Sequence, residues 1–385
     1  MYRIYYAEKD TTLYEKYPNQ NTGIDQILEL TKIASGSRLD GVIQAKTYNT
    51  RILLDFGTEI TSLSQSIVDG GTPHLNQGNV TSASVYLNLH AMEASDIQHN
   101  YSIHAYNVSE SWDNGNGLYT DTPLTDIGSS WYNKSGDNVS TPIPWNTGSA
   151  ESVTDGVGAT ISVGGGTYRT TTTSSQTFIN TSPDIRMDVT AIIKDIIASG
   201  VPNHGIMIKR NANDERSGEN LGSLKFFGRE SHTIFVPRLE VCWDDVTPGT
   251  GNVEVNTIST NTYVPYIKNI KSEYRTNEIA RFWVGVRPEF PTKTYQTSSF
   301  YMTTDRLPVS SSYSIYDSVT NDVIIKDEDS WGNSTTKMAS HASDGNYFDL
   351  RMDSFMPERY YKIKLTCRRI KDTQTFDNFY FKVVR

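Results

Sequence analysis

The sequence is poor in cysteine and has no long apolar run. Cys242 and Cys367 are its only cysteines, each within a strand-like segment, so a disulfide framework is excluded and two buried structural thiols are expected. No apolar run approaches the ~20 residues of a membrane-spanning helix. Residues 1–10 lack the apolar core of a secretory signal. We therefore expect a chain that is made in a cytoplasm and has no membrane span.

Charge and apolar content are also low. The 385 residues include 35 basic and 44 acidic side chains, for a formal net charge of −9. A nucleic-acid groove needs a basic stripe that displaces counterions from phosphates, so this balance argues against a nucleic-acid partner. Only 36% of residues are hydrophobic and 21% charged, whereas tyrosine is abundant with 23 copies, so long charged helices are not expected to dominate.

Short runs of β-branched and aromatic residues, bounded by Gly, Asn, Asp or Pro, predict β-strands along the whole chain. Val85, Leu87 and Leu89 alternate with polar residues, which places one face of that strand in a core and the other at the surface. We favour a strand at 26–33 as well. The other clear runs are 50–56, 101–108, 204–210, 223–229, 237–243, 280–286, 312–317, 322–325, 347–350, 360–365 and 379–384. The pattern predicts an all-β protein built as sandwiches.

Residues 188–200 depart from this alternation. Their apolar side chains follow helical spacing, Asp188 or Thr190 can cap the start, and Gly200 suits the position after the last turn. The segment predicts one short amphipathic helix packed on a sheet.

A change of composition divides the chain. Residues 246–262 form a turn-rich linker between a first domain, 1–245, and a second domain, 263–385. The second domain has roughly seven short strands in about 120 residues, which is typical of an immunoglobulin-like β-sandwich.

Residues 7–243 resemble the DNRLRE-type β-sandwich, a jelly-roll module related to carbohydrate-binding folds. The segments that carry the resemblance are, in order, 7–14, 21–23, 51–56, 83–89, 108–112, 187–193 and 202–209. The resemblance implies that domain 1–245 is a jelly-roll β-sandwich with one short helix.

The longer form of this module, with 223–233 before 237–245, resembles virion structural proteins of contractile-tailed bacteriophages, especially marine ones. That resemblance implies a non-enzymatic component of the tail, neck or baseplate, localised in the virion after synthesis in the host cytoplasm. Its expected partners are other virion proteins, in multiple copies within a symmetric assembly.

Two polar stretches, 113–160 and 164–175, predict long loops, and such loops are usually functional or shaped by a partner. Four aromatic residues lie within or beside the first loop: Trp112, Trp131, Tyr132 and Trp145. They either anchor the loop on the sandwich or stack on a sugar. The second interpretation makes the chain a glycan-binding module for host attachment, and it requires at least two of these rings to lie exposed in one groove.

Signs of chemistry are sparse. Asp113, Asn116 and Asp121 could offer oxygen ligands to a structural Ca²⁺, although no EF-hand spacing is present, and no other cofactor is expected. The glycine run 164–166 does not lead from a strand into a helix, which argues against phosphate binding. Glu110, with Asp113 and Asp121, could in principle serve a polysaccharide-degrading enzyme. No nucleophile–base pattern supports catalysis, and we expect no enzyme.

A short basic run lies near the C-terminus. Arg368, Arg369 and Lys371 are either a solvated hairpin end or a contact with an acidic neighbouring subunit.

Overall fold

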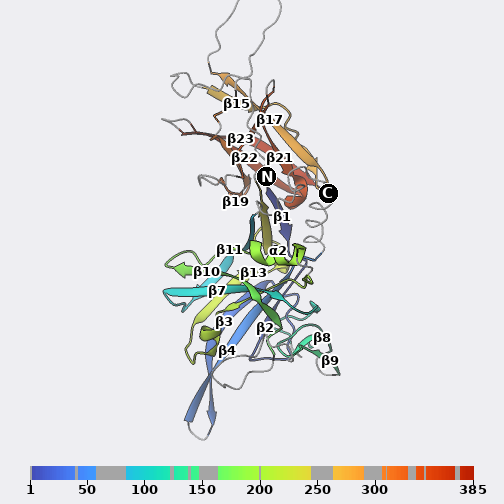
Figure 1. The fold of residues 1–385 in the computed structure, drawn as a ribbon, viewed down its shortest axis with the longest axis vertical. Helices are drawn as coiled ribbons and strands as arrows, with labels where there is room; N and C mark the ends of the chain where they lie inside the picture. The colour runs from blue at the N-terminus through green and yellow to red at the C-terminus, as the bar shows by residue number, and fades with distance from the viewer. Residues whose placement is uncertain are drawn as a thin grey trace, which may run out of the picture. The chain divides into compact units, whose positions relative to one another are not determined.

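The computed structural model describes residues 2–39, 42–57, 84–121, 125–137, 140–146, 164–198, 201–243, 263–289, 306–308, 310–327, 335–341, 344–368 and 373–385. Strands dominate these residues (Figure 1), which confirms the predicted all-β sandwich class. The chain forms two compact units, Tyr5–Glu240 and Met1–Ile4 with Val241–Arg385. The predicted linker 246–262 lies outside the described residues, so the predicted domain bounds stay a prediction.

The larger unit, Tyr5–Glu240, is built on two main sheets. The four-stranded sheet has the order β1 (Tyr2–Tyr6), β14 (Arg238–Cys242), β5 (Ser84–Leu89) and β11 (Ile185–Asp188), and the unit boundaries fall within β1 and β14. The eight-stranded sheet has the order β10 (Tyr168–Ile179), β7 (Asn100–Val108), β12 (Ile206–Arg210), β4 (Val42–Asp55), β3 (Ile27–Leu39), β13 (Gly222–Phe227) and β6 (Ala91–Ser95), with β2 (Lys9–Tyr14) paired to β4. A small hairpin joins β8 (Asn133–Asp137) and β9 (Thr141–Pro144).

Alternation along the strands places the core between these sheets. Val85, Leu87 and Leu89 of β5 are buried, as their spacing predicted. Leu28 and Leu30 of β3 are buried in the same way. Burial of such side chains stabilises the fold by about 1.5–3 kcal/mol each.

The predicted helix is present as α2 (Thr190–Ala198). Val189, Ile192 and Ile193 are buried, and the Asp188 carboxylate caps the start by accepting a hydrogen bond from the Thr190 amide at 2.9 Å. A second helix, α3 (Ala212–Arg216), and the 3₁₀ turns η2 (Arg229–Ser231) and η3 (Met352–Ser354) were not predicted. They are too short to show a hydrophobic period.

The predicted loop at 164–175 is wrong from Tyr168 onward, because β10 occupies Tyr168–Ile179 and pairs with β7. β10 lies at an edge of the eight-stranded sheet, and many of its side chains face solvent. An exposed edge strand tolerates polar threonines and serines, and this made the segment look like a loop.

β3 and β4 form a hairpin that continues past its neighbouring strands. β13 pairs with β3 only from Ile27 to Lys32, and β2 pairs with β4 only from Thr50 to Asp55. Beyond them, residues 33–39 and 42–48 pair only with each other among the described strands. We call this part the β3–β4 ribbon. Figure 1 shows the ribbon as the long blue pair of strands. Seven residues in each strand correspond to a ribbon length of roughly 20 Å.

The smaller unit is a second sandwich. One sheet has the order β15 (Tyr263–Ile267), β17 (Ile279–Pro288), β21 (Gly345–Arg351) and β20 (Ala339–His341). The other has the order β16 (Glu273–Arg275), β23 (Thr373–Val384), β22 (Arg359–Arg368), β18 (Ser312–Asp317) and β19 (Val323–Ile325). The rings of Phe282 and Tyr313 stack on Phe348 with centroids 5.2 and 4.2 Å away, which joins the two sheets through one aromatic core.

Candidate functional site

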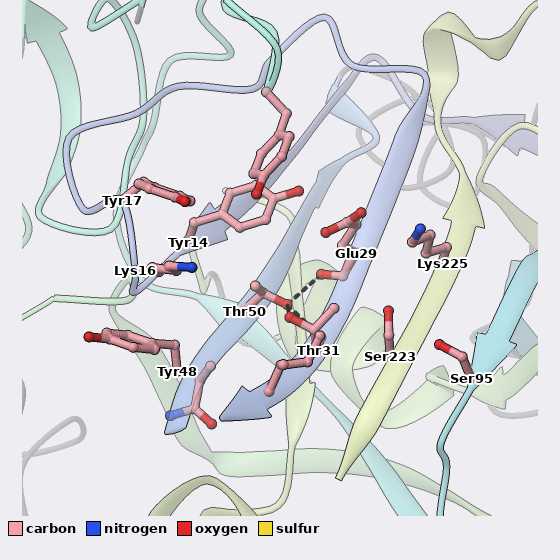
Figure 2. A pocket seen from close by; sticks show the side chains of 13 residues that line it. Tyr14, Lys16, Tyr17, Glu29, Thr31, Tyr48, Thr50, Ser95, Ser223 and Lys225 are labelled. Carbon is pink, nitrogen blue, oxygen red and sulfur yellow. Dashed lines mark hydrogen bonds between the residues drawn. The ribbon is translucent and has the colours of Figure 1, made fainter. Parts of the chain in front are cut away.

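A hollow of about 310 Å³ lies in the larger unit, where the eight-stranded sheet meets the loop that carries Tyr119. Figure 2 shows the side chains around it. We call it the tyrosine hollow, because four tyrosines contribute to its wall. Its lining residues are Tyr14, Lys16, Tyr17, Glu29, Thr31, Ile33, Tyr48, Asn49, Thr50, Ser95, Tyr119, Ser223 and Lys225.

The polar side of the hollow is set by strand register. Ser223 of β13 lies opposite Ser95 of β6 and Thr31 of β3, so three hydroxyl-bearing residues form one row across the sheet. Two residues further along β13, Lys225 lies opposite Glu29 and Glu93, which gives a charged row roughly 7 Å away.

The hydroxyl groups on the polar side of the hollow differ in their partners. Thr50 Oγ1 donates to the Glu29 carbonyl at 2.7 Å and accepts from the Thr31 amide at 2.6 Å, so the strands fix that hydroxyl (Figure 2). Ser223 Oγ has no hydrogen-bond partner among the described residues, although the residue is only 6% exposed.

On the aromatic side of the hollow, neighbouring rings and hydrogen bonds hold Tyr119 in place. The Tyr119 ring lies 5.0 Å from the Tyr14 ring and 6.0 Å from the Tyr17 ring, measured between centroids. Its backbone is also fixed, because the Tyr119 amide donates to the Asp25 carboxylate at 3.0 Å and its carbonyl accepts from Gln20 Nε2 at 2.9 Å. Tyr119 nevertheless remains 42% exposed, so a positioned ring faces solvent.

The surroundings of the aromatic wall favour the protonated, uncharged forms of the Tyr14 phenol and the Asp25 carboxyl group. Burial raises the pKa of Tyr14 well above its usual value, and the nearby Glu29 and Asp25 carboxylates act in the same direction. Burial also raises the pKa of Asp25 to about 6; the Tyr119 amide lowers it, while Glu29 and Asp121 raise it further. The residues that line the hollow offer tyrosine rings, hydroxyl groups and one carboxylate, Glu29, beside the Lys225 ammonium.

The predicted loop 113–160 with the four aromatic residues within or beside it, which we call the aromatic loop, differs from the tyrosine hollow. Trp112, Trp131 and Trp145 are 2–3% exposed and pack with Leu13, Leu53, Val108 and Met207 in one core cluster. Tyr132 alone is exposed. The four residues therefore do not form the exposed groove that stacking on a sugar requires, and the three indole rings anchor the loop on the sandwich.

Hydrogen bonds reinforce that anchoring. Trp112 Nε1 donates to the His204 carbonyl at 2.9 Å, and Trp145 Nε1 donates to the Ser130 carbonyl at 3.0 Å. Glu110, a candidate carboxylate for catalysis, pairs with Lys134 at 2.5 Å and accepts from Thr167 Oγ1 at 2.7 Å. These contacts give Glu110 a structural role, because they link residue 110, before the loop, to Lys134 within it and to Thr167 after it.

The glycine run fits against the same cluster. Gly164, Gly165 and Gly166 all have positive φ, and a Cβ on Gly164 would lie 2.5 Å from the Trp131 carbonyl oxygen. Gly165 accepts a hydrogen bond from Arg51 at 2.7 Å through its carbonyl. Close packing over Trp131 therefore explains Gly164 and Gly165, and a Cβ on Gly166 would lie 2.5 Å from Met207 Cε.

The calcium candidates Asp113, Asn116 and Asp121 stay a prediction, and the structure gives the surroundings of each. Asp121 caps its own turn, because its Oδ2 accepts from the Leu118 amide at 2.9 Å and from Thr125 Oγ1 at 2.6 Å. Asp113 and Asn116 are exposed. Within the ranges that the structure covers, no group of three or more His, Cys, Asp or Glu side chains could hold a metal ion.

Of the basic run, only Arg368 belongs to the described residues; Arg369 and Lys371 lie outside them. Arg368 pairs with Asp327 at 2.8 Å. Its guanidinium therefore has an acidic partner within its own chain.

None of the residues that line the tyrosine hollow was among the site residues predicted from the sequence. The alternation of Glu29, Thr31 and Ile33 on β3 was a visible signal that these side chains share one face. No pattern in the sequence places Tyr119, about ninety residues away, beside them.

Comparison with models of known protein families, with curated proteins and with solved structures gives no match. The resemblance to the DNRLRE-type module and to phage virion proteins stays a prediction. Both cysteines are buried, and neither forms a disulfide. Among the described helices, none has the length and apolar character needed to cross a bilayer.

Proposed function

We propose that this chain is a non-enzymatic structural component of a tailed bacteriophage virion, in the tail, neck or baseplate region, where it docks onto neighbouring subunits. The resemblance of the longer form of the module, with 223–233 before 237–245, to virion structural proteins supports this setting. The observation that carries the docking role is the β3–β4 ribbon, residues 33–39 and 42–48.

A ribbon of this kind suits contact with a partner. A two-stranded hairpin by itself is marginally stable in water, and among the described strands no third strand pairs with the ribbon. A neighbouring subunit that receives the ribbon would cover its backbone and side chains. Together with the sandwich surface, such a contact should bury more than about 1,000 Å² if it holds an assembly together.

Antibodies against the purified chain test the setting. Immunogold labelling of tailed particles should mark a fixed position on the tail, neck or baseplate, with several copies for each particle. The absence of label from intact and from disrupted particles would contradict the proposal.

A shortened ribbon tests the docking role. Because Ala34 and Thr47 are register partners, residues 35–46 can be replaced by a two-residue Asn-Gly turn. The shortened chain should unfold at the same temperature as the wild type and should no longer be incorporated into particles. Incorporation at the wild-type level would remove the ribbon from the proposal.

The glycan-binding alternative needs a different surface from the one first predicted. The rings of Trp112, Trp131 and Trp145 are covered, so they offer no face to a sugar. We place any glycan contact at the tyrosine hollow instead.

A further inference from the structure

We propose that the tyrosine hollow binds a neutral hexopyranose unit of a glycan. The inference goes beyond the virion role, and it can be tested on the isolated chain whether or not particles contain that chain. It depends on the rings, the hydroxyl row and the charge balance of the hollow.

The size and lining of the hollow fit a small ligand. A volume of about 310 Å³ is at the lower end for small-molecule sites, which combine aromatic walls with a few polar groups in fixed positions. The polar groups stand on the paired strands β3, β13 and β6, so their spacing is fixed by the sheet.

The Tyr119 ring offers a positioned apolar face. Tyr14 and Tyr17 pack against this ring, and hydrogen bonds with Asp25 and Gln20 fix its backbone. One face of a pyranose ring presents C–H groups, and these pack well on an aromatic face. Because the ring is already held in place, binding costs little side-chain entropy.

The hydroxyl row supplies the polar complement. Ser223 Oγ is buried without a hydrogen-bond partner in the described part of the chain, and a buried hydroxyl left in this state is destabilising. A sugar hydroxyl above the row could bond to Ser223 and to Ser95 opposite it. Figure 2 shows both serines beside Glu29 and Lys225, which could accept from and donate to a second sugar hydroxyl.

The charge balance favours a neutral ligand. Lys225 forms an ion pair with Glu93 at 2.9 Å, and that bond raises its pKa. Glu29 and Lys16 both line the hollow and carry opposite charges. An anionic sugar would meet no excess of positive charge, whereas hydroxyl groups can use both carboxylate and ammonium.

The test titrates the purified chain with neutral trisaccharides of glucose, galactose, mannose or rhamnose, followed by calorimetry and by ligand-observed NMR. A trisaccharide that contains glucuronate serves as the anionic comparison. At least one neutral trisaccharide should show saturable binding, and Tyr119→Ala should weaken it by about tenfold or more. Ser223→Ala should weaken binding several-fold, and it leaves the Tyr119 ring in place.

Tyr132→Ala is the matched control, because Tyr132 is an equally exposed tyrosine that does not line the hollow. It should leave the affinity unchanged. The proposal is overturned if no neutral trisaccharide binds up to roughly 10 mM, if the glucuronate sugar binds more tightly, or if Tyr119→Ala binds as the wild type does. Circular dichroism of each variant separates loss of binding from loss of fold.

Discussion

Arg51 and Glu215 form a bidentate ion pair inside the larger unit: Nε lies 3.0 Å from Oε1 and Nη2 lies 2.9 Å from Oε2. Lys209 Nζ adds a third contact to Glu215 at 2.6 Å, and Lys32 Nζ donates to the Glu215 carbonyl at 2.6 Å. Burial disfavours the Glu215 carboxylate, but the two cations outweigh it and lower its pKa. The cluster ties α3 to strands β3, β4 and β12.

Glu215→Gln should therefore destabilise the larger unit strongly. The change leaves Arg51 and Lys209 buried without their counter-charge, and breaking a buried pair in this way costs about 3–5 kcal/mol. Urea unfolding followed by tryptophan fluorescence would measure the loss. The exposed Glu219→Gln is the control and should stay within about 0.5 kcal/mol of the wild type; equal stabilities of the two variants would contradict the structural role.

Asp10 should make stability fall as the pH rises. Burial raises its pKa from 3.8 to about 7, although its carboxylate accepts a hydrogen bond from the Arg229 amide at 2.6 Å. Between pH 4 and 7 the folded chain keeps a proton that the unfolded chain has released. The contribution of Asp10 to the free energy of unfolding therefore drops by roughly 4 kcal/mol across that window and is level above it.

Asp10→Asn should remove this contribution, because the amide does not ionise. Unfolding free energies of wild type and variant, measured from pH 4 to 8, should differ progressively in favour of the variant as the pH rises. Asp113→Asn makes the same change at an exposed site and should leave the pH profile unaltered. A constant difference between wild type and Asp10→Asn would refute the prediction.

Trp145→Ala should detach the aromatic loop from the sandwich. The change removes a buried indole and its hydrogen bond to the Ser130 carbonyl, which costs about 3–5 kcal/mol. Hydrogen exchange of amides 129–135 should accelerate in the variant. Tyr132→Ala, at an exposed position in the same loop, should leave both stability and exchange near their wild-type values.

Gly164→Ala should also weaken the larger unit. Its φ of +121° is rarely adopted by other residues, and the new Cβ would lie 2.5 Å from the Trp131 carbonyl oxygen. The strain alone costs about 1–3 kcal/mol, as thermal unfolding would show. Gly218→Ala is the matched control, since a Cβ there meets nothing within 4 Å. An unchanged melting temperature for Gly164→Ala would mean that this packing is wrong.

The strand alternation of β5 and the helical spacing of α2 could be predicted because burial periodicity is a local property. Val85, Leu87 and Leu89 turn inward in any sandwich that contains this strand. The polar edge strand β10 could not be recognised in this way, since its threonines and serines follow solvent exposure at an edge. The five-residue α3 likewise shows no hydrophobic period, and its Glu215 ion pairs and its N-cap hold it in place.

The amino-acid sequence by itself therefore determined the all-β class, most strand positions and the one amphipathic helix. Only the tertiary structure decided that Trp112, Trp131 and Trp145 face the core while Tyr119 faces solvent. The sequence of a polar loop that contains tryptophan is the same whether the indole ring is buried or exposed. The tyrosine hollow arises because strand pairing brings Ser223 beside Thr31, and because loop packing sets Tyr119 over Tyr14; both depend on contacts between residues far apart in the chain.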